Sequence, residues 1–311
     1  MASPLIVLQT EMPPSQPDSS SSPPSLDDLR REIDRIDDAL HDLLLQRTAI
    51  GEQIGAAKGR SGEVTLRPGR EAEIIRRLMA RHRGSFPRLA LIRIWREIIS
   101  AMVGLQGPFT VAVTASETGG GFLELARNHY GTTVPVLALR TPGQVVGAVA
   151  DGGATVGVVP VPGREEAEGG ARPDAWWIGL MSDATGLPRI ISRLPFASET
   201  SATGSGIEAL AIAKMAGDPT GFDRSWLGIE TEPDLSRARF KTLLAAAGFE
   251  PSLFASTWRG EGRWLHLVEV IGHTSPDDGR IPRLTTKNSQ ILRTVVLGGH
   301  AVPLSADVLG E

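Results

Sequence analysis

Side chains that bind anions occur at helical spacing in the first third of the chain. The apolar residues Leu40, Leu43 and Ile50 follow an alternating spacing of three and four, and the position that continues this series is Arg47. A guanidinium does not lose its proton, so burying it without an anionic partner is very costly. Lys58 follows about three turns later on nearly the same helix face. Something anionic is therefore expected to meet this face.

Two further predicted helices add polar groups to the same set. One begins with Arg70 and Glu71, and the inward positions of the other are Ile92, Trp95, Ile99, Met102 and Gln106. Cations and a neutral donor thus converge inside an otherwise apolar bundle, which favours a site for an anionic ligand. A second interpretation stays open, in which Arg47 pairs with an internal carboxylate such as Glu71 and Lys58 is a solvated helix end.

Three helices must position these groups. The first is predicted over residues 26–58, because no proline interrupts the pattern, Ser25 can cap its start and Gly59 follows its end. At 1.5 Å per residue it would run roughly 50 Å, so we expect it to pair with another long helix from a second subunit. The other two are predicted over residues 70–82 and 87–106, and Gly107-Pro108 closes the unit.

After Pro108 the pattern changes to alternating strands and helices. Strands over 109–115, 134–139 and 155–161, with helices ending near Gly131 and over 143–150, indicate a parallel sheet, and residues 163–175 read as a loop. The final stretch has the order of a ferredoxin-like domain. Its predicted elements are strand 226–230, helix 235–247, strands 250–258 and 264–271, helix 288–297 and strand 300–304.

Composition restricts the classes of function. The chain has 311 residues and no cysteine, and the absence of cysteine excludes thiolate catalysis. Its net charge of −4 gives no general attraction to nucleic acid or membranes. Its six histidines are scattered, so we expect no metal site. Residues 1–25 are rich in Pro and Ser and predict a disordered tail. Without a membrane-length apolar run or a signal-peptide pattern, a cytoplasmic protein is expected.

Sequence motifs resemble those of a known family. The first predicted helix carries Leu29-Arg30-Arg31-Glu32-Ile33-Asp34-Arg35-Ile36-Asp37, then Leu43-Leu44-Leu45-Gln46-Arg47 and Gly55-Ala56-Ala57-Lys58. Together with Arg70-Glu71-Ala72-Glu73-Ile74-Ile75 and Trp95-Arg96-Glu97-Ile98-Ile99-Ser100 before Gln106, these resemble the three helices of the all-helical chorismate mutases. The resemblance implies an intertwined homodimer over residues 26–107. It also implies an isomerase that converts chorismate to prephenate in phenylalanine and tyrosine biosynthesis, without a cofactor.

The resemblance also implies roles for individual residues. Arg47, and Arg30 of the neighbouring subunit, would bind the carboxylates of the substrate. Lys58 and Gln106 would donate to the breaking ether oxygen, and Glu71 would accept from the ring hydroxyl. A unimolecular rearrangement needs such positioning and charge stabilisation rather than a nucleophile.

Three more positions complete the expected site. Arg70 would support the positive field around the substrate. Arg67 stands where the family often has an acidic residue, and Met102 stands where it has a small or polar one. Both departures concern secondary contacts, so they affect substrate affinity more than the type of reaction.

The remainder resembles the later part of the bifunctional chorismate mutase–prephenate dehydratases. Residues 108–222 read as a degenerate dehydratase-like region, because Val156–Pro160 continues as Val161-Pro162-Gly163 instead of a Glu-Asn-Ser motif. Residues 223–311 resemble an ACT domain, with Leu235–Ala238 in place of a Gly-Ala-Leu effector loop. An aromatic amino acid effector and a plain dimerisation scaffold are both open readings of this part, and Trp176-Trp177 is expected to be a packing anchor.

Three functions are thus compatible with the sequence. The first is a chorismate mutase that binds chorismate and prephenate. The second is a bifunctional chorismate mutase/prephenate dehydratase. The third is a non-catalytic, ligand-sensing regulatory protein of the same pathway.

Overall fold

A computed structural model of the chain describes residues 23–57, 66–115, 121–163, 167–168, 175–182, 184–197, 206–233, 235–260, 262–286 and 288–310. Nearly all of the predicted tail and the whole of Lys58 lie outside these residues. The chain divides into two compact units, residues 1–54 and 55–311. Among the described residues, no helix is long and apolar enough to cross a membrane.

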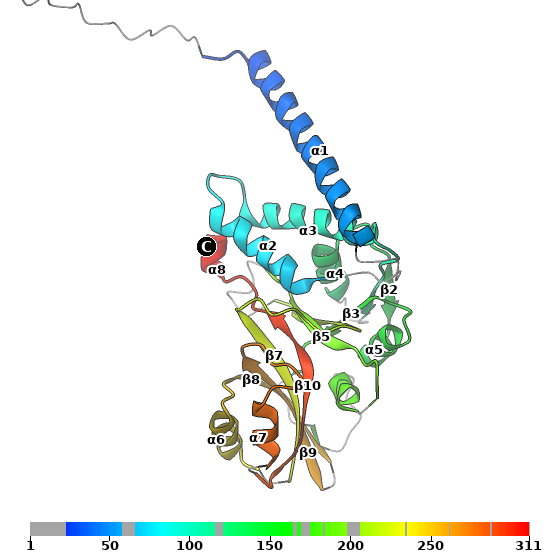
Figure 1. Ribbon diagram of the computed structural model, residues 1–311, viewed down its shortest axis with the longest axis vertical. Coiled ribbons are helices and arrows are strands. Elements are labelled where there is room, and N and C mark those ends of the chain that lie inside the picture. Colours follow the sequence, from blue (N-terminus) through cyan, green and yellow to red (C-terminus); the bar gives the residue numbers. More distant parts are fainter. Residues whose placement is uncertain are drawn as a thin grey trace, which may run out of the picture. The chain divides into compact units, whose positions relative to one another are not determined.

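The first unit holds most of helix α1 (Leu26–Ala57), which confirms the prediction for this segment (Figure 1). Ser25 starts it, because its hydroxyl accepts from the Asp28 N–H at 3.2 Å while the Asp28 carboxylate accepts from the Ser25 N–H at 3.1 Å. The apolar stripe of α1 is open to solvent in the single chain: Leu40 and Leu43 are 56% and 58% exposed. A stripe of this length and composition is typical of a helix that packs against a partner.

Helices α2 (Pro68–Arg81) and α3 (Arg88–Gly104) belong to the second unit. Helix α2 begins two residues earlier than predicted, because a proline is favourable in the first turn of a helix. Helix α3 ends at Gly104, so the prediction that Gln106 lies within it is wrong. The two helices and the short α8 (Ala306–Leu309) share one apolar cluster. Its buried members are Ala72, Ile75, Met79, Ile92, Phe196, Leu304 and Leu309.

The strands form one ten-stranded sheet in the order β2-β1-β3-β6-β5-β10-β7-β9-β8-β4. Strands β1 (Val111–Thr114), β2 (Val136–Leu139) and β3 (Val156–Pro160) pair in parallel, as predicted, and are linked by α4 (Phe122–Tyr130) and α5 (Pro142–Ala150). Strand β6 (Ala209–Ala213) is antiparallel to β3 and to β5 (Arg189–Leu194), so the sheet as a whole is mixed.

The second half of the sheet has the predicted βαββαβ order. It consists of β7 (Asp223–Thr231), α6 (Arg237–Ala247), β8 (Pro251–Gly260), β9 (Arg263–Ile271), α7 (Arg280–Thr286) and β10 (Ile291–Ala301). The predicted helix over 288–297 and strand over 300–304 are wrong. Thr294, Val295 and Val296 are β-branched and favour the extended backbone that pairs with β7. Strand β4 (Ala167–Glu168), inside the predicted loop, pairs with β8 at the edge.

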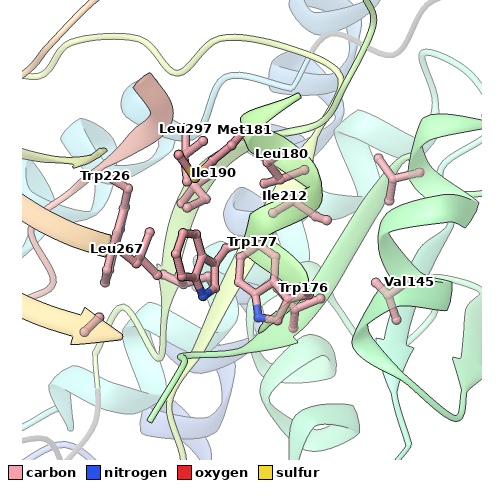
Figure 2. Close-up of a cluster of buried hydrophobic side chains, with 14 of the residues drawn as sticks. Val145, Trp176, Trp177, Leu180, Met181, Ile190, Ile212, Trp226, Leu267 and Leu297 are labelled. Atoms are coloured by element: carbon pink, nitrogen blue, oxygen red, sulfur yellow. The ribbon is translucent and has the colours of Figure 1, made fainter. Parts of the chain in front are cut away.

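One apolar cluster runs across both halves of the sheet (Figure 2). The 3₁₀ helix η1 (Ala175–Met181) places Trp177 at its centre, fully buried among residues such as Ile190 and Trp226. The packing role expected for Trp176 and Trp177 is confirmed, since both are buried. Strand β5 meets β10 in parallel at Gly298. A side chain at Gly298 would collide with the backbone of Ile190. The domain boundary placed at residues 222–223 stays a prediction, although strands from both sides share this sheet.

Helix α2 is held against the loop before β7. The Arg76 guanidinium donates to Thr220 Oγ1 at 2.9 Å and to the Val302 carbonyl at 2.7 Å. Arg67 Nε donates to Asp218 at 2.6 Å. Gly69 allows this close approach, because a Cβ there would lie 2.7 Å from the carbonyl oxygen of Asp218.

We therefore expect Gly69→Ala to lower the free energy of unfolding by about 1–3 kcal/mol, because a backbone atom cannot move aside cheaply. Gly104→Ala is the matched control. It lies in a helix with no atom within 4 Å of its added Cβ, and should be neutral or stabilise by up to about 1 kcal/mol. Urea unfolding followed by circular dichroism measures both. Equal effects of the two substitutions would contradict this account of α2 docking.

Candidate active site

The residues predicted for the site are distributed over both units. Arg30 and Arg47 lie on α1 in the first unit. The second unit holds the rest of the described set: Arg67, Arg70, Glu71, Met102 and Gln106. Arg30 is exposed and pairs with Asp27 one turn before it, at 3.1 Å. Such a surface pair contributes little and leaves the guanidinium available to another partner.

Glu71 pairs with Arg96, which the sequence interpretation did not assign to the site. Arg96 Nη1 donates to the Glu71 carboxylate at 2.9 Å, and the two side chains are only 4% and 12% exposed. Burial raises the pKa of Glu71, and the adjacent guanidinium opposes that shift. Burial likewise lowers the pKa of Arg96. The alternative interpretation paired Glu71 with Arg47, but Glu71 is paired with Arg96 on α3.

Helix α3 buries part of the predicted inward series and two residues outside it. Its buried residues are Ile92, Arg96, Ile99, Ser100 and Val103, whereas Trp95 and Met102 are half-buried. The inward position of Ile92 and Ile99 is confirmed, and that of Trp95, Met102 and Gln106 in a two-chain bundle stays a prediction. Arg96 follows Ile92 by one turn, so the same helical spacing could have identified it. A charged residue on an apolar face was the signal, as it was for Arg47.

Contacts with the end of α4 hold α3 in this orientation. The Ser100 hydroxyl donates to the Tyr130 carbonyl, and the Glu97 carboxylate accepts from the Thr132 N–H at 3.0 Å. Gly131 lies between these two contacts with a positive φ of 89°. A Cβ at Gly131 would lie 3.0 Å from Glu97 and Ser100, which favours glycine there.

Gln106 lies in the turn after α3, where its N–H donates to the Val103 carbonyl at 3.0 Å. The last turn of α1, which belongs to the second unit, approaches it: a Cβ at Gly55 would lie 4.0 Å from Gln106 Cγ. The Gln106 side chain is half-buried. The end of α1 and the end of α3 thus meet near the predicted amide donor.

The two predicted cations at the start of α2 are exposed, and each is paired with a carboxylate. Arg70 donates to Glu73 at 3.0 Å, and Arg67 is bound by Asp218, which raises the pKa of Arg67 further. Glu71, between them in sequence, is the buried member of this first turn. The structure thus brings Glu71 to Arg96 and leaves Arg67 and Arg70 at the surface.

Comparison with known proteins identifies this helical segment. Residues 29–107 match the family model described as chorismate mutase type II. These residues form a chorismate mutase type II domain. The match covers α1 from Leu29 onward, together with α2 and α3, and ends one residue after Gln106.

Curated proteins give the same result for the first part of the chain. A bifunctional chorismate mutase/prephenate dehydratase of Pseudomonas aeruginosa is 31% identical over 144 residues, which are 44% of this chain and 39% of that protein. An intracellular chorismate mutase of Mycolicibacterium smegmatis is 38% identical over 64 residues, 21% of this chain and 62% of that protein. The chain therefore spans less than two thirds of the relatives it matches.

Solved structures resemble a larger part of the chain more weakly. Prephenate dehydratase from Streptococcus mutans gives a TM-score of 0.44 at 15% identity, over 63% of this chain and 98% of that structure. A protein described as a quorum quenching acylase, GqqA, gives a TM-score of 0.43 at 16% identity, over 63% and 95%.

The Glu71–Arg96 pair leads to a test of stability. Arg96→Met alone should lower the free energy of unfolding by about 3–5 kcal/mol, because it leaves a buried carboxylate unpaired. The double variant Glu71→Met with Arg96→Met should lose much less, because apolar side chains replace both charges. Urea unfolding of the two single variants and the double variant gives the coupling energy. Additive losses would show that the pair does not act as a unit.

Proposed function

We propose that residues 29–107 catalyse the rearrangement of chorismate to prephenate and that two copies of the chain build each site. The match of these residues to the chorismate mutase type II family carries the proposal. It is supported by the positions of Arg30, Arg47, Lys58 and Gln106, which stand where the family motifs require cations and a donor.

The reaction requires a particular kind of site. Chorismate is a dianion whose rearrangement is unimolecular, so the enzyme must select the reactive conformer and stabilise the charge that grows on the ether oxygen. Arg47, and Arg30 of the second copy, would each bind a carboxylate through two parallel N–H groups. Lys58 and Gln106 would donate to the ether oxygen. Because an amide donates without prior protonation, activity is expected at neutral pH.

The exposed stripe of α1 supports the dimer. Leu40, Leu43 and Ile50 lie on it and are each more than half exposed in the single chain. Burying such a stripe against the same helix of a second copy would remove apolar surface from water over most of the helix length. It would also bring Arg30 of one copy towards the site of the other.

Arg47→Ala and Gln106→Ala should each lower kcat/KM for chorismate at least about 100-fold, as expected for lost transition-state donors. The loss of chorismate absorbance measures the rate. Arg31→Ala is the matched control, since Arg31 is an exposed neighbour of Arg30 that pairs with Asp28. The residue assignment is wrong if either variant keeps near-normal activity.

A mixing experiment tests whether the site is shared. Arg30→Ala and Arg47→Ala chains should both be inactive alone. Unfolding and refolding them together should restore activity, because the mixed dimer has one site that carries neither change. No recovery, despite a confirmed mixed dimer, would place both residues in the same copy's site.

The same assay distinguishes the other two functions. Phenylpyruvate formed from chorismate would support a bifunctional mutase and dehydratase, as the relatives' names describe for themselves. Binding of chorismate without turnover would support a regulatory protein. Prephenate that accumulates unchanged is the outcome expected here.

A cavity of about 270 Å³ in the second half of the sheet supports an aromatic amino acid as effector. It is lined by Leu235, Ser236, Arg237, Phe240, Phe254, Thr257, Arg259, Trp264 and His266. Arg237 lies over the Phe254 ring at 5.2 Å, and Arg259 lies over Trp264 at 4.6 Å. Two cations beside the start of α6 would attract a carboxylate, and the rings would contact an aromatic side chain.

His266 shapes this cavity without adding charge. Its ring contacts Thr231 Oγ1 at 3.1 Å and Thr257 Oγ1 at 3.0 Å. Burial, together with Arg237 and Arg259, lowers the pKa of His266 to about 4. The ring is therefore neutral near pH 7, and the positive charge of the cavity comes from its arginines.

L-Phenylalanine should raise the Tm of the protein in a concentration-dependent way, because a ligand that binds only the folded state stabilises it. Arg237→Ala should weaken this binding at least about tenfold, in line with a lost charged hydrogen bond. Arg239→Ala, an exposed position on the same helix outside the cavity, should leave it unchanged. No Tm shift in the wild-type protein would favour a plain dimerisation scaffold.

A further inference from the structure

A second cavity, of about 350 Å³, opens between α3, α4 and the segment that follows β5. It lies within the second unit and away from the cavity at the start of α6. Its lining residues are Leu89, Ile92, Arg93, Arg96, Gly121, Glu124, Leu125, Asn128, His129, Pro195, Phe196, Ala197 and Ile207. The volume is within the range of sites that hold small molecules.

The wall of this cavity contains a buried guanidinium. Arg96 is 4% exposed and uses Nη1 to bind Glu71. A guanidinium has five N–H donors, and the bond to Glu71 is the one hydrogen bond that Arg96 makes within the described residues. Its charged group also lies 5.2 Å from the centre of the Phe196 ring. Arg96 therefore keeps N–H donors that can bind a ligand in the cavity.

A buried imidazole lines the same cavity. His129 is 7% exposed, and it follows Asn128 on α4. Burial and the charge of Arg96 hold the pKa of His129 well below its ordinary value. The ring is therefore neutral at neutral pH, so it adds no charge to this wall.

The charges around the cavity limit the ligand. Arg96 is shared with Glu71, and the exposed Arg93 and Glu124 carry opposite charges. The N–H groups of Arg96 that Glu71 leaves unused suit one carboxylate, whereas a second negative charge on the ligand would have no further buried guanidinium to bind and would be repelled by Glu71. Much of the remaining wall is apolar, including Leu89, Ile92, Leu125 and Phe196. One negative charge on an apolar body fits these walls best.

We propose that this cavity binds a small monocarboxylate with an apolar body. The carboxylate oxygens accept from the free N–H groups of Arg96, with Asn128 and His129 beside them. The hydrocarbon part packs against Phe196, Ile92 and Leu125. Such a site adds a ligand to those considered above, and Arg96 joins it to Glu71, which the sequence resemblance assigned to the chorismate site.

Isothermal titration with benzoate tests the site in the full-length protein. We expect benzoate to bind at one saturable site per chain. Benzamide and inorganic phosphate should bind with an affinity at least about tenfold lower. Benzamide has the same shape without the charge, and phosphate has charge without an apolar body. Equal binding of either compound, or no binding of benzoate, would overturn the proposal.

Two tryptophan variants on α4 locate the binding. Asn128→Trp places a large ring over the cavity from an exposed position. It should lower the affinity for benzoate at least about tenfold. Leu123→Trp changes an exposed position on the same helix outside the cavity. This variant should bind benzoate with the affinity of the wild-type chain. Benzoate bound at the other cavity or at the chorismate site would ignore Asn128→Trp, and that result would refute the assignment.

A third variant tests the guanidinium itself. Glu71→Met with Arg96→Met removes both charges of the pair and leaves the other cavity walls in place. Benzoate binding should again fall at least about tenfold, because the charged donor is gone. If the folded double variant binds benzoate normally, Arg96 is not the carboxylate ligand and the proposal fails.

Discussion

Glu71 and Arg96 are buried against each other between α2 and α3, and the packing of these two helices depends on this contact. A charge shielded from water must be paired, and removing one partner of such a pair costs about 3–5 kcal/mol. The pair therefore sets the rotation of α3 about its axis relative to α2. That rotation buries Ile92 and Ile99 and leaves Trp95 and Met102 half-covered. It also directs the rest of the Arg96 guanidinium to the cavity beside α4.

Two other constraints shape the protein around this pair. Helix α2 can approach the loop before β7 only because Gly69 has no side chain. Arg76 then joins the helix to the backbone carbonyls of Phe222, just before β7, and Val302, just after β10. The sheet has a similar constraint at Gly298, where β10 meets β5. These close contacts let the helical segment share a unit with a sheet that continues through the ferredoxin-like part. The apolar stripe of α1 is open to solvent in the single chain, which supports the proposal that two copies build each site.

Much of the local structure could be predicted because it depends on neighbours in sequence. Ser25 and the stripe that follows it identify α1, and the alternating apolar runs identify β1 to β3. The prediction failed at residues 288–297, where the β-branched Thr294, Val295 and Val296 favour a strand but a short apolar run is also compatible with a helix. What decides there is β7, to which β10 is hydrogen-bonded along its length. The paired residues are 60 to 78 positions apart in sequence, so the local pattern alone does not decide between helix and strand.

For the candidate site, the sequence alone determined which residue types stand at the family's positions, from Arg30 and Arg47 to Gln106. It also determined that charged groups interrupt apolar helix faces. Tertiary structure decided which partner each charge has: Glu71 meets Arg96, and Arg67 meets Asp218. It also decided that Arg96 borders a cavity. The physical reason is that helical periodicity sets the spacing of residues on one helix, whereas the rotation and docking of that helix depend on surfaces supplied by distant segments.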